Sequence, residues 1–283
     1  MMIVMRKFSF SDLATTLFLW ALSFIFLVPF YITFINAFKI QKDIVTNPLG
    51  IPFARLTIKN ILRNLNSRSF NLAIGYGTSL FLAVVTVFLV IIAASACAYV
   101  LSRNRRQAGF RYSYLLLLLG LMLPIQVILL PIVKILAAIK LMFTIWGLLV
   151  LYLGWYMPFA VFTFVGYIGT ISPQLDESAK IDGANEVQVF FKIILPLMGP
   201  VLTSVAIYIA VWTWNDFVSP LIILSSSKFY TVTIGIYRAI GQYTQKWDDV
   251  FAILLFAIVP LLVLFLALQK QFISGLTAGA LKG

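Results

Sequence analysis

Residues 72–100 read LAIGYGTSLFLAVVTVFLVIIAASACAYV, a stretch without one charged side chain. A helix needs about 20 apolar residues to cross the roughly 30 Å hydrocarbon core of a bilayer, and this stretch is longer. Its Leu, Ile and Val residues occur in runs and do not alternate with polar ones, which argues against a transmembrane β-strand. Because lipid cannot satisfy backbone hydrogen bonds, the stretch is predicted to form a membrane-spanning helix.

Five further apolar stretches are close to the length of a membrane-spanning helix or longer. They lie at residues 13–35, 113–133, 143–167, 198–224 and 250–268. The first follows two basic residues, as a signal peptide would, but its apolar run is too long and no small-residue cleavage site follows it. It is therefore expected to be retained, and the predicted fold class is all-α integral membrane with six transmembrane helices.

The composition of the whole chain agrees with a bilayer as its solvent. Of the 283 residues, 62% are hydrophobic and only 11% are charged, and the mean hydropathy is +1.02. A soluble domain carries about a quarter charged residues, so this chain has too little charged surface for water. Its single cysteine, Cys97, has no partner within the chain, which excludes an internal disulfide framework.

Several kinds of site are excluded by the residue types. The chain has no histidine, so a His-ligated zinc centre and a Ser-His or Cys-His nucleophile cannot be built within it. No paired carboxylates occur in the apolar stretches, and the phosphate-binding pattern G-x-x-x-x-G-K-[ST] is absent. The sequence therefore predicts no catalytic residue, no metal site and no enzyme activity.

The net charge of +12 has a simple interpretation. The basic residues lie in short segments between the apolar stretches, as they do beside membrane helices, and not in a nucleic-acid-binding array. Counting Lys and Arg in alternate segments does not decide the orientation of the chain. The short loop 103–111 holds four arginines, and this density favours an N-terminus inside the cell.

The most polar stretch of the chain lies between the fourth and fifth apolar stretches, at residues 168–197. Ser172 followed by Pro173 is typical of a helix start, and the two acidic residues that follow suit the positive end of the helix dipole. Gly183 then interrupts the pattern and can adopt a positive φ. This half of the loop is predicted to be a short helix that ends in a tight turn.

The second half of the loop is predicted to be another short helix, with Asn185 as its cap. Pro196 is expected to end this helix. One apolar face is expected from residues at helical spacing, namely Val187, Phe190, Phe191 and Ile194.

The loop has two possible roles. It could be an interfacial hairpin that only links two membrane helices, or it could dock against another protein. A cluster of small residues, which allows another surface to approach closely, favours docking. The cluster consists of Ser178, Ala179, Gly183 and Ala184.

Residues 177–184 (ESAKIDGA), followed by Phe191, residues 194–196 (ILP) and Pro200, closely resemble the EAA loop of ABC importer permeases. The family pattern is E-A-A-x-x-D-G-A, then F, then I-x-L-P, then P. Ser178 departs from it, because the family usually has alanine there. Residues 214–217 (WNDF) and the C-terminal residues 275–283 are similar to the carbohydrate-uptake, maltose-transporter-type branch, and the resemblance extends over essentially the whole chain.

The resemblance implies a type I ABC importer permease-like bundle, with residues 1–283 as a single transmembrane permease domain. The protein would lie in a bacterial-type cytoplasmic (inner) membrane, surrounded by lipid. Residues 168–197 would be a cytoplasmic coupling loop and residues 274–283 a cytoplasmic C-terminal tail, with the N-terminus on the same side. Residues implied to couple to the ATPase are Glu177, Ser178, Ala179, Asp182, Gly183, Ala184 and Pro196.

The resemblance also implies partners. A second permease subunit would complete the pore as a heterodimer, two ATPase subunits would bind ATP and Mg, and an extracytoplasmic solute-binding protein would deliver the substrate. This chain would hold no cofactor itself, and it is not expected to bind nucleic acid. The expected function is import of sugars, with oligosaccharides as the expected class. Glycerol phosphate or another polar solute, and a self-powered secondary transporter, remain alternatives.

Asp216 is the ionisable residue that lies deep in an apolar stretch, and such a residue is by default a candidate for function. It could form part of the wall of the sugar path, or it could pair with a neighbouring helix or with the partner permease. Gln126 and Tyr152 are weaker candidates for the path. The residues expected beside Asp216 on the path are Asn215, Trp212 and Trp214.

Overall fold

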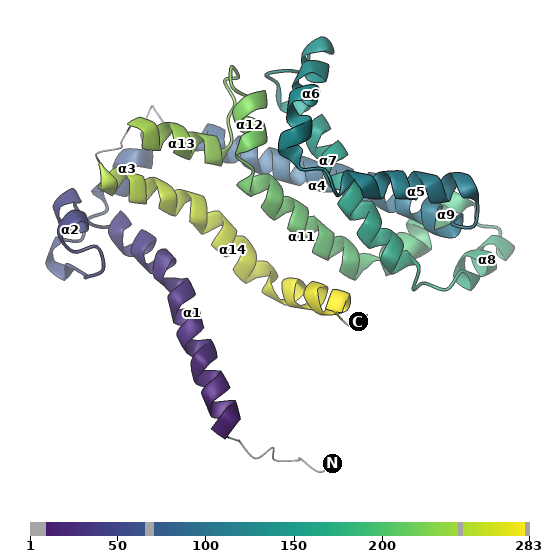
Figure 1. Ribbon diagram of the computed structural model, residues 1–283, viewed down its shortest axis with the longest axis horizontal. Helices are drawn as coiled ribbons and strands as arrows, with labels where there is room; N and C mark the ends of the chain where they lie inside the picture. The colour runs from purple at the N-terminus through teal and green to yellow at the C-terminus, as the bar shows by residue number, and fades with distance from the viewer. Residues whose placement is uncertain (1–9, 66–70, 243–245, 281–283) are drawn as a thin grey trace. The chain divides into compact units, whose positions relative to one another are not determined.

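The computed structural model describes residues 10–65, 71–242 and 246–280, and every regular element within these ranges is a helix (Figure 1). Four helices are long and apolar enough to cross a membrane. They confirm the predicted first, second, fourth and sixth spans, and they are α1 (Phe10–Ala37), α4 (Leu72–Arg103), α7 (Ile145–Ile168) and α14 (Trp247–Ala280).

The predicted third span is not one straight helix. Residues 113–133 are divided between α5 (Ala108–Gly120) and α6 (Ile125–Ala138), whose axes differ by 105° (Figure 1). Pro124 precedes α6 with an extended backbone, and a proline disfavours helical geometry in the residue before it. The break therefore falls where the sequence places this proline.

The predicted fifth span is also interrupted. Residues 198–224 form α11 (Gly199–Asn215) and the short α12 (Val218–Ile223), because the backbone of Asp216 is extended with ψ of 130°. The helix that precedes α11 meets it at 76°. Within the described part of the chain there are thus four candidate spans, or up to six if each bent pair counts as one.

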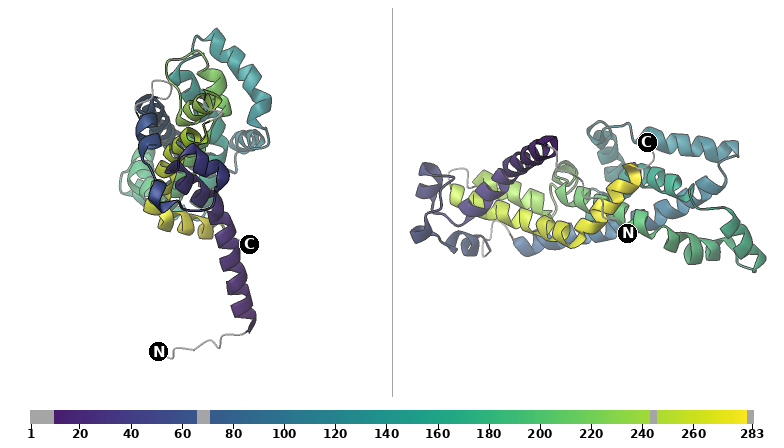
Figure 2. Two further views of the ribbon diagram at one scale, coloured as in Figure 1. Left: turned by 90° about the vertical axis from the view of Figure 1, so that its left-hand side faces the viewer. Right: turned by 90° about the horizontal axis from the view of Figure 1, so that it is seen from below.

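The chain forms two compact units. The larger unit contains residues 71–235 and the described residues from 260 to 280, and its centre is α4, which packs along α7 and α11 (Figures 1 and 2). Apolar side chains fill the space between these helices. Members of this core with no measurable exposure include Leu82, Val90, Leu148, Tyr152, Phe164, Ile168 and Ile209.

The smaller unit contains the described residues up to 65 and residues 236–259. Beside α1, the larger part of α13 (Val232–Gln242) and the beginning of α14, its described residues form three short helices. They are α2 (Gln41–Thr46), η1 (Phe53–Arg55) and α3 (Lys59–Leu65).

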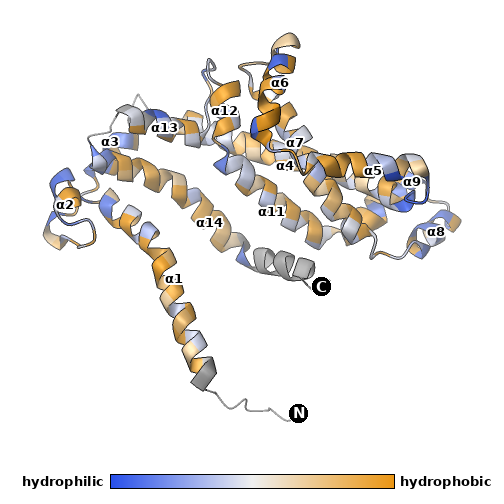
Figure 3. Cartoon of the chain, in the orientation of Figure 1, coloured by the Kyte–Doolittle hydropathy of each residue, from blue (hydrophilic) through white to orange (hydrophobic). Residues whose placement is uncertain are grey.

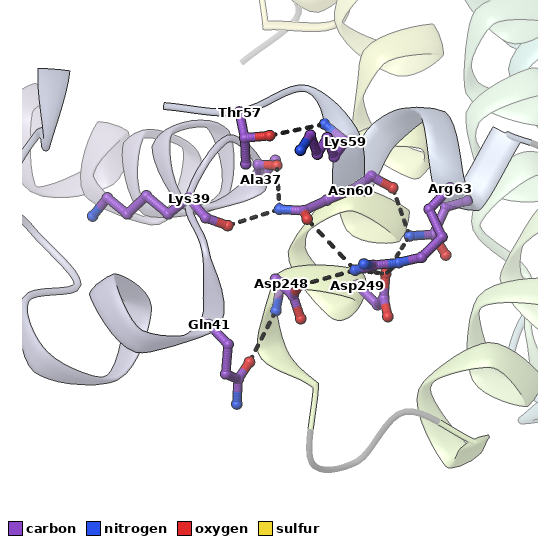
Figure 4. Close-up of polar contacts among 10 residues, drawn as sticks. Ala37, Lys39, Gln41, Thr57, Lys59, Asn60, Arg63, Asp248 and Asp249 are labelled. Carbon is purple, nitrogen blue, oxygen red and sulfur yellow. Dashed lines mark hydrogen bonds and ion pairs between the residues drawn. The ribbon is translucent and has the colours of Figure 1, made fainter. Parts of the chain in front are cut away.

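Polar side chains connect several elements of this unit (Figure 4). The amide of Asn60 on α3 donates to the main-chain oxygen of Lys39, at 2.7 Å. The guanidinium of Arg63 donates through Nε to Asp249 at 2.7 Å and through Nη2 to Asp248 at 2.9 Å. These contacts tie α3 to the start of α14.

The C-terminal residues predicted to form a tail continue the last helix. The backbone of α14 is helical as far as Ala280, which includes residues 274–280 of the predicted tail. Residues 281–283 lie outside the described part of the chain.

Candidate functional site

The polar loop between α7 and α11 contains the two short helices that the sequence predicts. The first is α8 (Gln174–Ile181), which is one of the most hydrophilic helices of the chain (Figure 3). The hydroxyl of Ser172 accepts a hydrogen bond from the main-chain N–H of Gln174 at 3.3 Å, and the main-chain oxygen of Pro173 accepts from Asp176. The predicted helix start is therefore confirmed.

The two faces of α8 differ in exposure. Asp176 and Ala179 are buried against the larger unit. Glu177 and Ser178 are exposed, and so is Ile181, whose side chain is 86% exposed. Of the residues predicted to couple, Asp182 and Gly183 are also exposed, Ala184 is half-buried, and Ala179 packs inward and is covered by the chain itself.

Gly183 ends α8 in the left-handed conformation, with φ of +88°. Its N–H donates to the main-chain oxygen of Lys180 and that of Ala184 donates to Ala179, which satisfies two carbonyls at the helix end. A Cβ atom placed on Gly183 would meet no other atom within 4 Å. The predicted turn is confirmed, and its positive φ favours glycine at this position.

The second arm of the loop begins as predicted. Asn185 caps α9 (Glu186–Val189), and its side chain and that of Gln188 exchange hydrogen bonds of 2.9 Å with each other's main-chain N–H. Such a capping box satisfies two N–H groups that would otherwise lack partners.

The predicted apolar face of this arm is wrong. Phe190 and Ile194 are buried, but Val187 is 64% exposed and Phe191 is 49% exposed. The buried face consists instead of Val189, Phe190 and Ile194. A π-helical turn, η2 (Phe190–Ile194), which holds an extra residue per turn, begins at Phe190.

Pro196 also behaves differently from the prediction, because it does not end the helix. It lies inside α10 (Leu195–Leu197), and the bend to α11 comes two residues later, at Met198. A proline near the start of a helical segment costs little, because its missing N–H would have no helical partner there. The π-helical turn immediately before Pro196 provides such a start.

The inner face of α8 is held by α4 through contacts that the sequence does not reveal. Arg103 donates to both carboxylate oxygens of Asp176, each at 2.9 Å, and the hydroxyl of Tyr99 donates to one of them at 2.9 Å. In the sequence, Arg103 is one of several loop charges and Asp176 suits the helix dipole. No local pattern pairs them, because they are 73 residues apart.

Asp216 lies at a junction of several helices in the larger unit. Its Oδ2 accepts a hydrogen bond from the hydroxyl of Tyr152 on α7 at 3.0 Å, and its Oδ1 accepts from the main-chain N–H of Ser219 in α12 at 3.4 Å. The main-chain oxygen of Asp216 accepts from the hydroxyl of Thr233, at the start of α13 (Val232–Gln242). The structure thus brings two candidate path residues, Asp216 and Tyr152, together.

The other candidate path residues are more dispersed. Trp212 is 41% exposed and its ring lies 6.0 Å from that of Tyr156, whereas Trp214 is buried and meets Tyr76 edge to face. Asn215 is exposed and donates to the main chain of its own helix. Gln126 is exposed on α6 and takes part in none of these contacts.

A cavity of about 700 Å³ lies between α4, α11 and the second half of α14, all within the larger unit. Trp214 and Thr203 line it, and the rest of its wall is aliphatic, Phe or Pro side chains. A sugar requires several hydrogen-bonding groups, which this wall does not provide. The cavity is therefore unsuited to a sugar, although it includes one residue predicted for the path.

Neither polar cluster resembles a metal centre. Among the described residues there is no group of three or more His, Cys, Asp or Glu side chains that could hold a metal ion. The geometry around α8 and Asp216 provides hydrogen bonds and contacts between helices.

Comparison with known proteins identifies the family. Residues 90–277 match the family described as binding-protein-dependent transport system inner membrane component. The chain is 35% identical over 263 residues to the multiple sugar-binding transport system permease protein of Streptococcus mutans, covering 90% of this chain and 92% of that protein. It is 30% identical over 264 residues to the arabinooligosaccharides transport system permease protein of Halalkalibacterium halodurans, covering 93% of each.

A solved structure supports the fold. The chain matches, with a TM-score of 0.78 and 20% identity, a chain in the crystal structure of a bacterial ABC transporter involved in the import of the acidic polysaccharide alginate. The match covers 94% of this chain and 99% of that one. The chain therefore belongs to the family of binding-protein-dependent transport system inner membrane components, as a membrane-embedded permease of the ABC importer type.

Proposed function

We propose that this permease imports sugars, with oligosaccharides as the main class, and that residues 168–197 receive an ATPase subunit on the cytoplasmic side. The relatives named above transport multiple sugars and arabinooligosaccharides, which supports the substrate class. The chain's own sequence has no phosphate-binding loop, so energy must reach it by contact with another protein.

One observation carries the proposal for the loop: one face of α8 is buried against the rest of the larger unit, and the other face is exposed. The inner face is fixed by Asp176, whereas the outer face presents Glu177, Ser178 and Ile181 to solvent. Ile181 adds an apolar side chain, 86% exposed, that a partner surface could cover. Glu177 adds a charge that a basic group of the partner can pair with.

The proposed mechanism is a lever. When the ATPase subunits close on ATP they carry α8 and α9 with them, and the membrane helices turn as packed bodies between inward-open and outward-open states. ATP and Mg belong to the ATPase subunits in this scheme. The loop and both termini then lie in the cytoplasm.

The proposed assembly contains two permeases. A chain with one docking loop can hold one ATPase subunit, so a second permease supplies the second loop and the other half of the pore. A solute-binding protein delivers the sugar from outside. Asp216, Tyr152 and the tryptophans Trp212 and Trp214 are proposed to influence the sugar path through the junction that they form or flank.

The test is uptake of a labelled oligosaccharide by membrane vesicles that contain the complete complex. Uptake should require ATP and the binding protein, and Ile181→Asp should release the ATPase subunits and abolish it. Arg106→Ala, which removes an exposed charge from the turn after α4, is the matched control and should leave uptake unchanged. Uptake driven by an ion gradient without ATP would instead establish a secondary transporter.

A further inference from the structure

We propose that Tyr99, Arg103 and Asp176, called here the α8 anchor, form the contact through which a movement of α8 displaces α4. Arg103 and Asp176 are then positioning residues for transport, because they act through the helices that they join. The inference rests on the function proposed above, in which α8 receives an ATPase subunit.

The geometry of the α8 anchor fixes both the distance between α4 and α8 and their relative orientation. Arg103 donates through Nε to Oδ2 of Asp176 and through Nη2 to Oδ1, each at 2.9 Å. Such a bidentate pair resists rotation of α8 relative to α4 as well as separation of the two helices. The hydroxyl of Tyr99 adds a third donor at 2.9 Å, and Asp176 is only 7% exposed. Water therefore competes little for these bonds.

The α8 anchor also holds the chain on both sides of α8. Nη1 of Arg103 donates to the main-chain oxygen of Ile171, before α8, at 3.1 Å. The ring of Tyr99 lies 5.6 Å from the ring of Phe190, where the second arm enters its π-helical turn. Tyr99 and Arg103 are four residues apart and share one face of α4. One turn of α4 thus contacts the entry, the helix and the exit arm of the loop.

Other links of α8 to its surroundings are weaker. Lys180 and Glu186 form an ion pair of 3.1 Å between α8 and α9, but their side chains are 47% and 78% exposed. Exposed pairs of this kind contribute little. Further connections are the apolar packing of Ala179, the short linker after α7 and the turn at Gly183. The α8 anchor is therefore the stiffest described contact between α8 and a membrane helix.

A displacement of α4 would reach the interior of the larger unit. Along its length α4 packs against α7 and α11. These helices carry Tyr152 and, at the end of α11, Asp216, which hydrogen-bond to each other. Movement of α8 can thus be passed to the polar junction as a motion of packed helices.

The experiment uses the complete complex, with both permeases, the ATPase subunits and the binding protein, in proteoliposomes. The readout is sugar taken up per ATP hydrolysed, for equal amounts of assembled complex. Arg103→Ala and Asp176→Asn should lower this ratio at least tenfold while the ATPase subunits stay bound, because the outer face of α8 is unchanged. Arg103→Lys should be intermediate, since one ammonium cannot form the bidentate pair. Arg106→Ala removes the same charge nearby and should stay within twofold of wild type.

An unchanged ratio in Arg103→Ala and Asp176→Asn would overturn the proposal, even if less complex were recovered, because the α8 anchor would then only stabilise the fold. Partial recovery of the ratio in the exchanged pair Arg103→Asp with Asp176→Arg would support it. A wild-type complex that hydrolyses ATP but takes up no sugar would contradict the proposed substrate and not the α8 anchor. In that case the anchor predicts that Arg103→Ala loses the stimulation of ATP hydrolysis by the binding protein.

Discussion

At the scale of single residues, variants of Gly183 can distinguish two reasons for a glycine in this turn, namely the backbone angle and the space that a side chain would need. Its φ of +88° costs a residue with a Cβ atom about 1–2 kcal/mol, and a β-branched residue more. Gly183→Val should therefore lower uptake per complex about tenfold, which corresponds to about 1.4 kcal/mol of lost coupling. Uptake by complexes of equal amount is the measurement.

Gly183→Asn is the matched control, because asparagine tolerates the left-handed region and the structure leaves room for its Cβ atom. It should retain most of the uptake. If the asparagine variant were as impaired as the valine variant, close approach of the ATPase, and not the backbone angle, would be what requires glycine.

Asp216 can be tested together with its partner Tyr152. Tyr152→Phe removes only the hydroxyl that donates to Asp216, and the loss of one such hydrogen bond costs about 1 kcal/mol. Asp216→Asn keeps one oxygen that can accept from the main-chain N–H of Ser219 in α12. Its NH2 group then replaces the oxygen that accepts from the hydroxyl of Tyr152. Both variants should lower the midpoint of thermal unfolding of the complex. Because both remove the same hydrogen bond, the double variant should have about the same midpoint as the single variants. Lost uptake at unchanged thermal stability would instead indicate that Asp216 faces the sugar.

At the scale of elements, α3 and the start of α14 are joined by charges. Asp249 is 1% exposed and accepts from Arg63 and Asn64, so removal of Arg63 leaves a buried carboxylate without its counter-charge. Breaking a fully buried pair costs about 3–5 kcal/mol, and the half-exposed Arg63 side chain reduces this to about 2 kcal/mol. Arg63→Ala should therefore increase cleavage in limited proteolysis of this unit.

Lys59→Ala, which removes an exposed charge from the same helix, should have no such effect. Replacing both members of the buried pair, as Arg63→Met with Asp249→Asn, should recover part of the resistance because the buried Asp249 carboxylate is no longer left unpaired, while Asp248 still loses its contact with Arg63. Equal cleavage of Arg63→Ala and wild type would show that α3 is held by its amide contacts alone.

At the scale of the whole molecule, the chain is expected to depend on its partners. It belongs to a permease family, and the proposed assembly contains a second permease. When this chain is expressed without the second permease, it should be degraded in the membrane. Co-expression with the second permease should raise its yield and half-life. A stable monomer that transports sugar by itself would contradict the proposed assembly.

The sequence by itself determined the membrane class, four of the spans, the turn at Gly183 and the cap at Asn185. Each depends on residues close together in the chain: an apolar run, a glycine after a helix, an asparagine before one. The resemblance of residues 177–184 to the EAA loop also needed no tertiary structure, and the family match confirms the family that it indicated.

Only the tertiary structure decided how these parts meet. The 105° angle between α5 and α6 and the π-helical turn before Pro196 do not follow from a helical period in the sequence. The pairs Arg103 with Asp176, Tyr152 with Asp216, and Arg63 with Asp249 join residues 64 to 186 positions apart. Nothing in the local sequence around either member identifies its partner, because a hydrogen bond forms with whichever side chain the opposite helix presents.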